Sequence, residues 1–190
     1  VLRPVVDAAD HMLDIHSTAQ PVDPFWVYPG HARNAQAAAA VGVPGVHLVM
    51  PGGMGTGTPL IEYDRFAQAD FHGVGLVVEC GQHFAQASAT LAREVTLRFL
   101  AHFGLIDPDP AWAPPGPQRR YELLRAVLVK SAEARFARPV IGMETFAEGE
   151  LIATDAGEEL RSPCADCTIF MPIRVPIPGR ELVYLTRPVD

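Results

Sequence analysis

Hydrophobic positions in the first half of the chain fall into short runs separated by polar and glycine-rich segments. Apolar runs at residues 12–15, 46–50 and 73–79 predict strands, and the last run is apolar on both faces, as in a central parallel strand. The segment HARNAQAAAAVG at residues 31–42 is rich in alanine and ends at a glycine, so we expect a helix there.

A longer helix is predicted at residues 84–103, because apolar residues recur there at four-residue steps and form one stripe. The stripe consists of Leu91, Val95, Phe99 and Phe103. Strands that alternate with helices in this way favour a mostly parallel sheet with helices on its faces. Residues 1–106 are therefore interpreted as an α/β domain.

The pattern changes at Asp107. The segment DPDPAWAPPGP continues neither a helix nor a strand, because proline lacks a backbone donor, and we interpret residues 107–118 as a linker. Short apolar runs punctuated by Gly and Pro follow, which predicts a small all-β domain at residues 119–190. Residues 121–136 fit a helix or a strand, and we favour a strand.

Composition limits the function. The chain has 190 residues, of which 48% are hydrophobic, and a formal net charge of -7. This charge argues against nucleic acid and against anionic membrane surfaces as partners, because both require basic groups. The three cysteines are too few for a disulfide framework and favour a reducing compartment, so a cytoplasmic location is expected. Cys164 and Cys167 form a lone CxxC, which we interpret as a tight turn rather than a zinc site.

Two polar residues stand at predicted strand ends, where ligands bind in open parallel sheets. His16 follows the first strand in MLDIHST, and Glu79 ends GVGLVVE. If these strands are neighbours, the imidazole and the carboxylate meet at one edge of the sheet. Asp14 shares a strand face with His16 and could orient its ring. Taken alone, His16 would more often be a half-buried structural histidine, but a carboxylate after an apolar run needs a partner.

The segments DIHST and GVGLVVECGQ, in that order, resemble the succinylglutamate desuccinylase/aspartoacylase family of zinc carboxypeptidase-like hydrolases. The tail from FAEGELIATD to PGRELVYL resembles the small β domain of the same family. The resemblance implies that His16 is the third zinc ligand and that Glu79 activates the zinc-bound water. It also implies hydrolysis of the amide bond of a small N-acyl amino acid, with zinc as the cofactor.

One departure from the family pattern concerns the other zinc ligands. The family supplies them from an H-x-x-E motif before the D-x-H segment, and no such motif precedes His16. His11 is a poor substitute because it falls on the opposite strand face. We therefore expect residues 1–106 to be the C-terminal portion of the catalytic domain of a longer enzyme, with a noncatalytic relative as the alternative.

Four further residues are candidates for roles at or near the site. Arg65 is the nearest cation for the substrate, and Thr18 either contacts substrate or caps a turn. Cys80 could serve a cysteine-nucleophile hydrolase, but it should point away from Glu79 into the other face of the sheet. For Tyr184, in a predicted strand of the β domain, the family resemblance implies a possible position at the site, but we favour core packing. The loop GGMGTGTP at residues 52–59 lacks the ending of a phosphate loop and is interpreted as a loop at the site rim, before a short helix at 60–69.

Three hypotheses result: a zinc-dependent N-acyl amino acid deacylase, a noncatalytic binding or structural module, and a thiol hydrolase. The expected partner is a small-molecule N-acyl amino acid. Assembly into a homo-oligomer is left open by the sequence.

Overall fold

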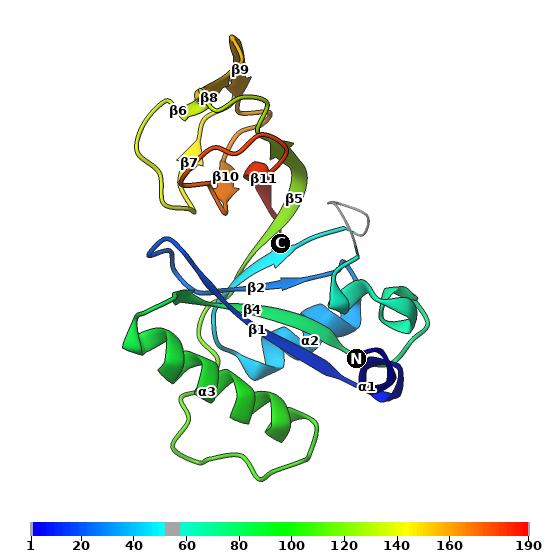
Figure 1. Cartoon of the computed structure of the whole chain (residues 1–190). Coiled ribbons are helices and arrows are strands. Elements are labelled where there is room, and N and C mark those ends of the chain that lie inside the picture. Colours follow the sequence, from blue (N-terminus) through cyan, green and yellow to red (C-terminus); the bar gives the residue numbers. More distant parts are fainter. Residues whose placement is uncertain (1, 52–57, 190) are drawn as a thin grey trace.

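The computed structural model describes residues 2–51 and 58–189. A mixed eight-stranded sheet runs through it, and Figure 1 shows its course. From edge to edge the strands are β1 (Met12–Thr18), β4 (Gly75–Gln82), β2 (Phe25–Tyr28), β3 (Val46–Val49), β5 (Arg119–Leu128), β11 (Glu181–Val189), β10 (Cys167–Phe170) and β7 (Thr145–Phe146). Strands β1 and β4, β2 and β3, and β3 and β5 pair in parallel, whereas β2 and β4 are antiparallel. Three of the four pairings among β1 to β5 are thus parallel, which confirms the predicted α/β class with a mostly parallel sheet.

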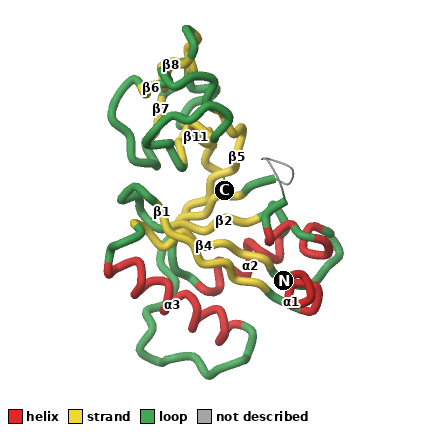
Figure 2. Tube along the Cα trace, viewed as in Figure 1, coloured by secondary structure: helices red, strands yellow, loops and turns green. Residues whose placement is uncertain are grey.

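Helices α2 (Ala32–Val41) and α3 (Gln86–His102) pack on one face of this sheet, and Figure 2 shows all helices in the first half of the chain. The predicted stripe of α3 faces the core, where Val95 and Phe99 are buried against β4. Helix α1 (Arg3–Ala8) was not predicted. The predicted short helix at 60–69 consists of two 3₁₀ turns, η1 (Leu60–Glu62) and η2 (Asp64–Ala67).

Strand β2, with the sequence FWVY, was missed in the sequence analysis although it lies at the centre of the first half. Three of its four residues are buried, and it pairs with both β3 and β4. Its signal is weak because Pro24 and Pro29 flank it and leave too few residues for a visible period. Its antiparallel pairing with β4 is what makes this part of the sheet mixed.

From Arg119 to Val189, here called the second half of the chain, the structure contains strands and no helices. Strand β5 leaves the first half and continues into this region, where β6 (Arg135–Phe136), β8 (Leu151–Asp155) and β9 (Glu158–Arg161) form a second sheet. The predicted strand in 121–136 is confirmed by β5. Because the large sheet is continuous through β5, it provides no boundary between the two halves. The division into domains at 1–106, 107–118 and 119–190 stays a prediction.

Residues 107–118 form no helix or strand, as a linker requires, but they are not detached. The guanidinium of Arg98 on α3 lies 5.2 Å from the Trp112 ring centroid and donates a hydrogen bond to the Ala113 carbonyl. The segment therefore packs against α3 on its way to β5.

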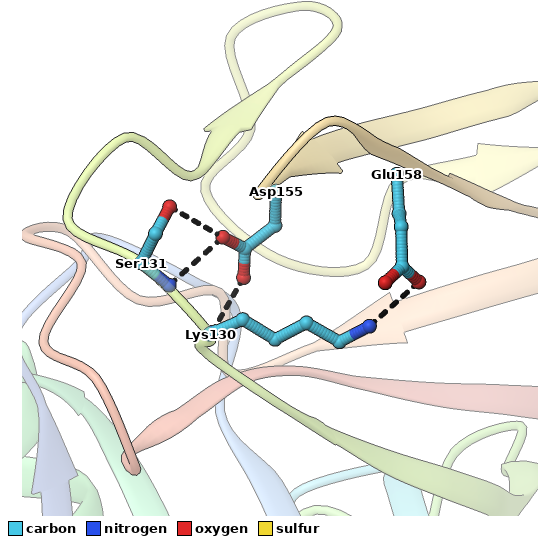
Figure 3. A network of polar contacts seen from close by, with 4 residues as sticks. All are labelled: Lys130, Ser131, Asp155 and Glu158. Carbon is cyan, nitrogen blue, oxygen red and sulfur yellow. Dashed lines mark hydrogen bonds and ion pairs between the residues drawn. The ribbon is translucent and has the colours of Figure 1, made fainter.

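A carboxylate ties the end of β5 to the second sheet (Figure 3). Asp155 at the end of β8 accepts hydrogen bonds from the backbone N–H groups of Lys130 and Ser131 and from the Ser131 hydroxyl. These hydrogen bonds hold the pKa of the Asp155 carboxyl below its usual value. Lys130 Nζ lies 2.6 Å from Glu158 on the neighbouring hairpin strand. The network fixes the turn after β5 and is structural.

A small hydrophobic core joins the two halves beneath the site. Phe25 of β2 packs edge-on against Phe170 of β10, with ring centroids 5.1 Å apart, and both side chains are fully buried. Leu48 and Leu123 belong to the same cluster.

Candidate active site

Side chains along β4 alternate between the hydrophobic core on one face of the sheet and a cavity on the other. Leu76, Val78 and Cys80 belong to the core beneath the helices, whereas Val77 and Glu79 line a cavity on the opposite face. The same two-residue period applies to the neighbouring strands. One face of the sheet therefore packs under the helices, and the other carries the candidate site.

The register of β1 and β4 brings the predicted trio together. His16 is paired with Glu79 across the parallel strands. Its Nδ1 atom lies 3.6 Å from Oε1 of Glu79, and its Nε2 atom lies 3.1 Å from Oδ1 of Asp14. The imidazole therefore stands between two carboxylates, one from its own strand and one from β4.

Glu79 is an unusual carboxylate because it is only 6% exposed and its Oε2 atom has no hydrogen-bond partner among the described residues. Burial raises the pKa of the Glu79 carboxyl, and the neighbouring His16 opposes this shift without cancelling it. Glu79 also lines a cavity, and a buried carboxylate with an unpartnered oxygen at a cavity is placed to accept a proton or a hydrogen bond from a ligand.

The cavity in front of Glu79 has a volume of about 450 Å³ and is built by both halves of the chain. Its sheet floor is formed by Phe25, Val27 and Leu48. Tyr184 and Glu181, both on β11, contribute a wall from the second half. Core packing was favoured for Tyr184 over a position at the site. The side chain does both, because it packs against the core that contains Phe25 and Phe170 and also lines the cavity.

Glu62 and Glu181 also line the cavity and were missed by the sequence analysis. They come from the 3₁₀ turn before β4 and from the last strand, and no local pattern connects these segments with His16 or Glu79. They come together only because η1 and β11 both lie beside the cavity in the folded chain.

Arg65 and Thr18 do not line this cavity. A guanidinium nitrogen of Arg65 donates to the Ala9 carbonyl, and the group lies 4.9 Å from the Phe71 ring centroid. Thr18 is buried, and its hydroxyl donates to the Gln20 carbonyl at 2.7 Å, which is a turn-capping contact. The described residues thus give neither side chain a place at the cavity, and their roles in substrate binding stay predictions.

The glycine-rich segment falls largely outside the described residues, which exclude 52–57. Its flanking residues Pro51 and Thr58 line the cavity, so the chain enters and leaves this segment at the site.

The cysteines lie away from the candidate chemistry. Cys80 is buried in the helix-side core, as predicted, and burial raises the pKa of its thiol to about 11, with the Glu79 charge contributing. A thiol with this pKa is a poor nucleophile near neutral pH. Cys164 precedes β10 and Cys167 begins it. Both are free thiols, and the turn between β9 and β10 contains Cys164 and ends at Cys167, which is buried in the core of the second half.

The geometry of His16 fits a metal ligand, but the described residues do not complete a metal site. A metal-ligating histidine usually directs its second nitrogen to a carboxylate, as Nε2 of His16 does to Asp14, which leaves Nδ1 facing Glu79. A catalytic zinc needs three protein ligands. Within residues 2–51 and 58–189, no group of three or more His, Cys, Asp or Glu side chains is arranged to hold a metal ion.

His11 does not fill this gap. Its Nδ1 atom accepts a hydrogen bond from the Val74 N–H, and its ring stacks on Phe103 with centroids 3.6 Å apart. His11 precedes β1 and is engaged with the helix side of the sheet, opposite His16 as the sequence predicts.

Comparison with known proteins shows where this architecture occurs. The chain matches no protein-family model and no curated protein. Among solved structures it is similar to succinylglutamate desuccinylase from Vibrio cholerae, with a TM-score of 0.72 and 18% identity over 98% of this chain and 56% of that one. It is also similar to the product-bound ectoine utilization protein EutE (DoeB) from Ruegeria pomeroyi, with a TM-score of 0.68 and 16% identity over 97% of this chain and 60% of that one.

This chain has the succinylglutamate desuccinylase/aspartoacylase fold. A protein of that description from Rhodobacter sphaeroides matches with a TM-score of 0.66 and 16% identity, covering 98% of this chain and 60% of that one. The resemblance inferred from DIHST and GVGLVVECGQ is thereby confirmed as a resemblance of fold. The chain spans 56–60% of the lengths of these three proteins.

None of the helices in the described part of the chain combines the length and hydrophobicity required to span a membrane.

Proposed function

We propose that this chain carries the catalytic carboxylate of a deacylase-type hydrolase that cleaves the amide bond of a small N-acyl amino acid. The observation that supports it best is Glu79, a buried carboxylate that has one unpartnered oxygen and lines a cavity beside His16. The fold agrees with this function, because similar solved structures are described as desuccinylases.

Glu79 acts as the general base in this proposal. It removes a proton from water as the water oxygen bonds to the acyl carbon, and it then gives that proton to the leaving nitrogen as the carbon–nitrogen bond breaks. A raised pKa suits both steps, because it makes the carboxylate a better base at neutral pH. Asp14 holds the His16 ring through Nε2, which keeps Nδ1 directed at the reaction centre.

We further propose that His16 is a zinc ligand through Nδ1, with the remaining ligands supplied from outside the described residues. Zinc, when bound, polarises the carbonyl and lowers the pKa of water. The donor set supports this assignment only in part, because the described residues provide no group of three metal-ligating side chains.

The decisive test is Glu79→Gln, assayed for amine release from a panel of N-acyl amino acids. Loss of the general base should lower kcat by about 10²–10⁴-fold. The exposed Glu148, which makes no ion pair or side-chain hydrogen bond among the described residues, provides the matched control Glu148→Gln. Unchanged turnover in Glu79→Gln would contradict the proposal.

The incomplete ligand set favours a second candidate, a noncatalytic binding module of the same fold. Elemental analysis for zinc, with the intact mass recorded on the same preparation, separates the two. About one zinc per chain with measurable amide hydrolysis supports the enzyme. Absence of both from the complete gene product supports the binding module.

A cytoplasmic location and assembly into a homo-oligomer belong to the same proposal. Size-exclusion chromatography with light scattering would determine the second of these.

A further inference from the structure

Two of the three cysteines stand at the ends of one turn in the second half of the chain. Cys164 and Cys167 flank Ala165 and Asp166, which form the turn between β9 and β10. Asp166 has a φ of +56°, a left-handed conformation that tight turns often require. A four-residue turn brings its first and last Cα atoms within about 7 Å, and a disulfide spans about 4.4–6.8 Å between Cα atoms. The spacing of the two cysteines along the turn therefore suits a disulfide.

Both cysteine side chains contact the same hydrophobic core. Cys167 is buried in the core of the second half, and Cys164 packs against that core from the other end of the turn. Burial raises the pKa of the Cys167 thiol, and the neighbouring Cys164 thiol adds to this shift. The Ser162 hydroxyl donates a hydrogen bond to the Cys164 carbonyl at 2.8 Å, which holds the first residue of the turn in place. The turn thus holds two free thiols beside each other.

The two thiols differ in their access to solvent. Cys164 is partly exposed, whereas Cys167 is 0% exposed. The thiolate is the nucleophile in thiol–disulfide exchange, and burial makes the Cys167 thiol harder to ionise. Cys164 is therefore the thiol that meets a dissolved oxidant, and Cys167 is placed to react with a sulfur on Cys164. The third cysteine, Cys80, lies in the separate core beneath the helices.

We propose that Cys164 and Cys167 form a reversible disulfide, so that this turn is a redox-sensitive modification site whose oxidant is a small disulfide such as oxidised glutathione. The Cys164 thiolate attacks one sulfur of oxidised glutathione, which forms a mixed disulfide and releases one glutathione. Cys167 then loses its proton to water, and its thiolate attacks Sγ of Cys164, which closes the protein disulfide and releases the second glutathione. The protein loses two hydrogen atoms and two electrons, and the oxidant gains both. This inference does not depend on the proposed hydrolase function.

The test incubates the wild-type protein with oxidised glutathione and then records the intact mass and the free thiols. The product should weigh two hydrogen atoms less than the starting protein and retain one free thiol of three after denaturation. The disulfide should lie within the tryptic peptide 162–174, which contains both residues, and dithiothreitol should restore all three thiols. Three free thiols after the incubation, or a lasting glutathione adduct in place of the disulfide, would overturn the proposal.

Single variants assign the order of attack. Cys167→Ala should accumulate the glutathione adduct on Cys164, because the thiol that displaces the glutathione is gone. In Cys164→Ala, modification of the buried Cys167 should be at least about tenfold slower than modification of Cys164 in Cys167→Ala. The control Cys80→Ala should form the same disulfide as wild type. Equal rates in the first two variants would refute the assigned order, and the wild-type mass measurement decides the disulfide itself even if a variant fails to fold.

Discussion

A buried histidine on the core side of the sheet should make the stability of this protein depend on pH. His47 on β3 is 1% exposed, its Nδ1 atom lies 2.9 Å from the Tyr28 hydroxyl, and its Nε2 atom has no partner among the described residues. Burial, together with the positive charge of Arg120, lowers the pKa of His47 from 6.5 to about 4. The folded protein therefore holds this imidazole neutral across the range in which the unfolded chain binds a proton.

The size of the effect follows from the two pKa values. The unfolded state binds the proton below pH 6.5 and the folded state only below about pH 4, so stability is lost as pH falls through this window. At about 1.4 kcal/mol per pH unit, the loss approaches about 3 kcal/mol near pH 4. This is a large part of the ~5–15 kcal/mol that stabilises a typical domain.

Replacement by glutamine removes the titration and keeps a polar group beside Tyr28. Urea unfolding, followed by fluorescence of the buried Trp26, would give the free energy of unfolding of wild type and His47→Gln at several pH values. The difference between the two proteins should change by about 3 kcal/mol from pH 7 to pH 4, in favour of the variant at low pH. The exposed His72 provides the control His72→Gln, which should follow the wild-type curve. A constant difference between wild type and His47→Gln would refute the reasoning.

Three further predictions concern other parts of the molecule. Phe25→Ala should lower the free energy of unfolding by about 3–5 kcal/mol in urea titrations, because it leaves a hole in the core that joins the two halves. Cys80→Ala should hydrolyse N-acyl amino acids at the wild-type rate, since its thiol lies on the core side, and a large loss of kcat would revive the thiol hydrolase. Asp155→Asn should lower Tm because it weakens the contacts to Lys130 and Ser131. The carboxylate stabilises the fold above its unfolded pKa near 3.8, so the wild-type advantage should disappear in acid, and equal Tm values at neutral pH would contradict this.

The sequence was most informative where the chemistry is carried by neighbouring parallel strands. His16 and Glu79 each stand near the end of an apolar run, and parallel strands that end at the same edge bring such residues together. The helix at α3 was predictable for a similar reason, since its four-residue stripe is long enough to define a period. Both predictions start from local patterns in the sequence. For His16 and Glu79, the rule that neighbouring parallel strands end at the same edge of the sheet then connects two such patterns.

Other features could not be predicted from such patterns. Strand β2 is only four residues long and lies between prolines, yet it contributes the floor of the cavity through Phe25. Glu181 and Glu62 reach the site because β11 and η1 lie beside it in space, although more than 100 residues separate them along the chain. Arg65 shows the converse, since a basic residue close to the site in sequence is held by a carbonyl and an aromatic ring elsewhere.

The register of β4 connects the fold with the proposed function. Shifting this strand by one residue would exchange the faces of Glu79 and Cys80, so that the carboxylate would enter the hydrophobic core and the thiol would face the cavity. Such a shift is strongly disfavoured, because a charged group without a partner in a hydrophobic core costs several kcal/mol. The same alternation places Asp14 and His16 on the cavity side of β1 and Leu13 on the core side. The hydrophobic core that stabilises the sheet thus also fixes which polar side chains are presented to the substrate.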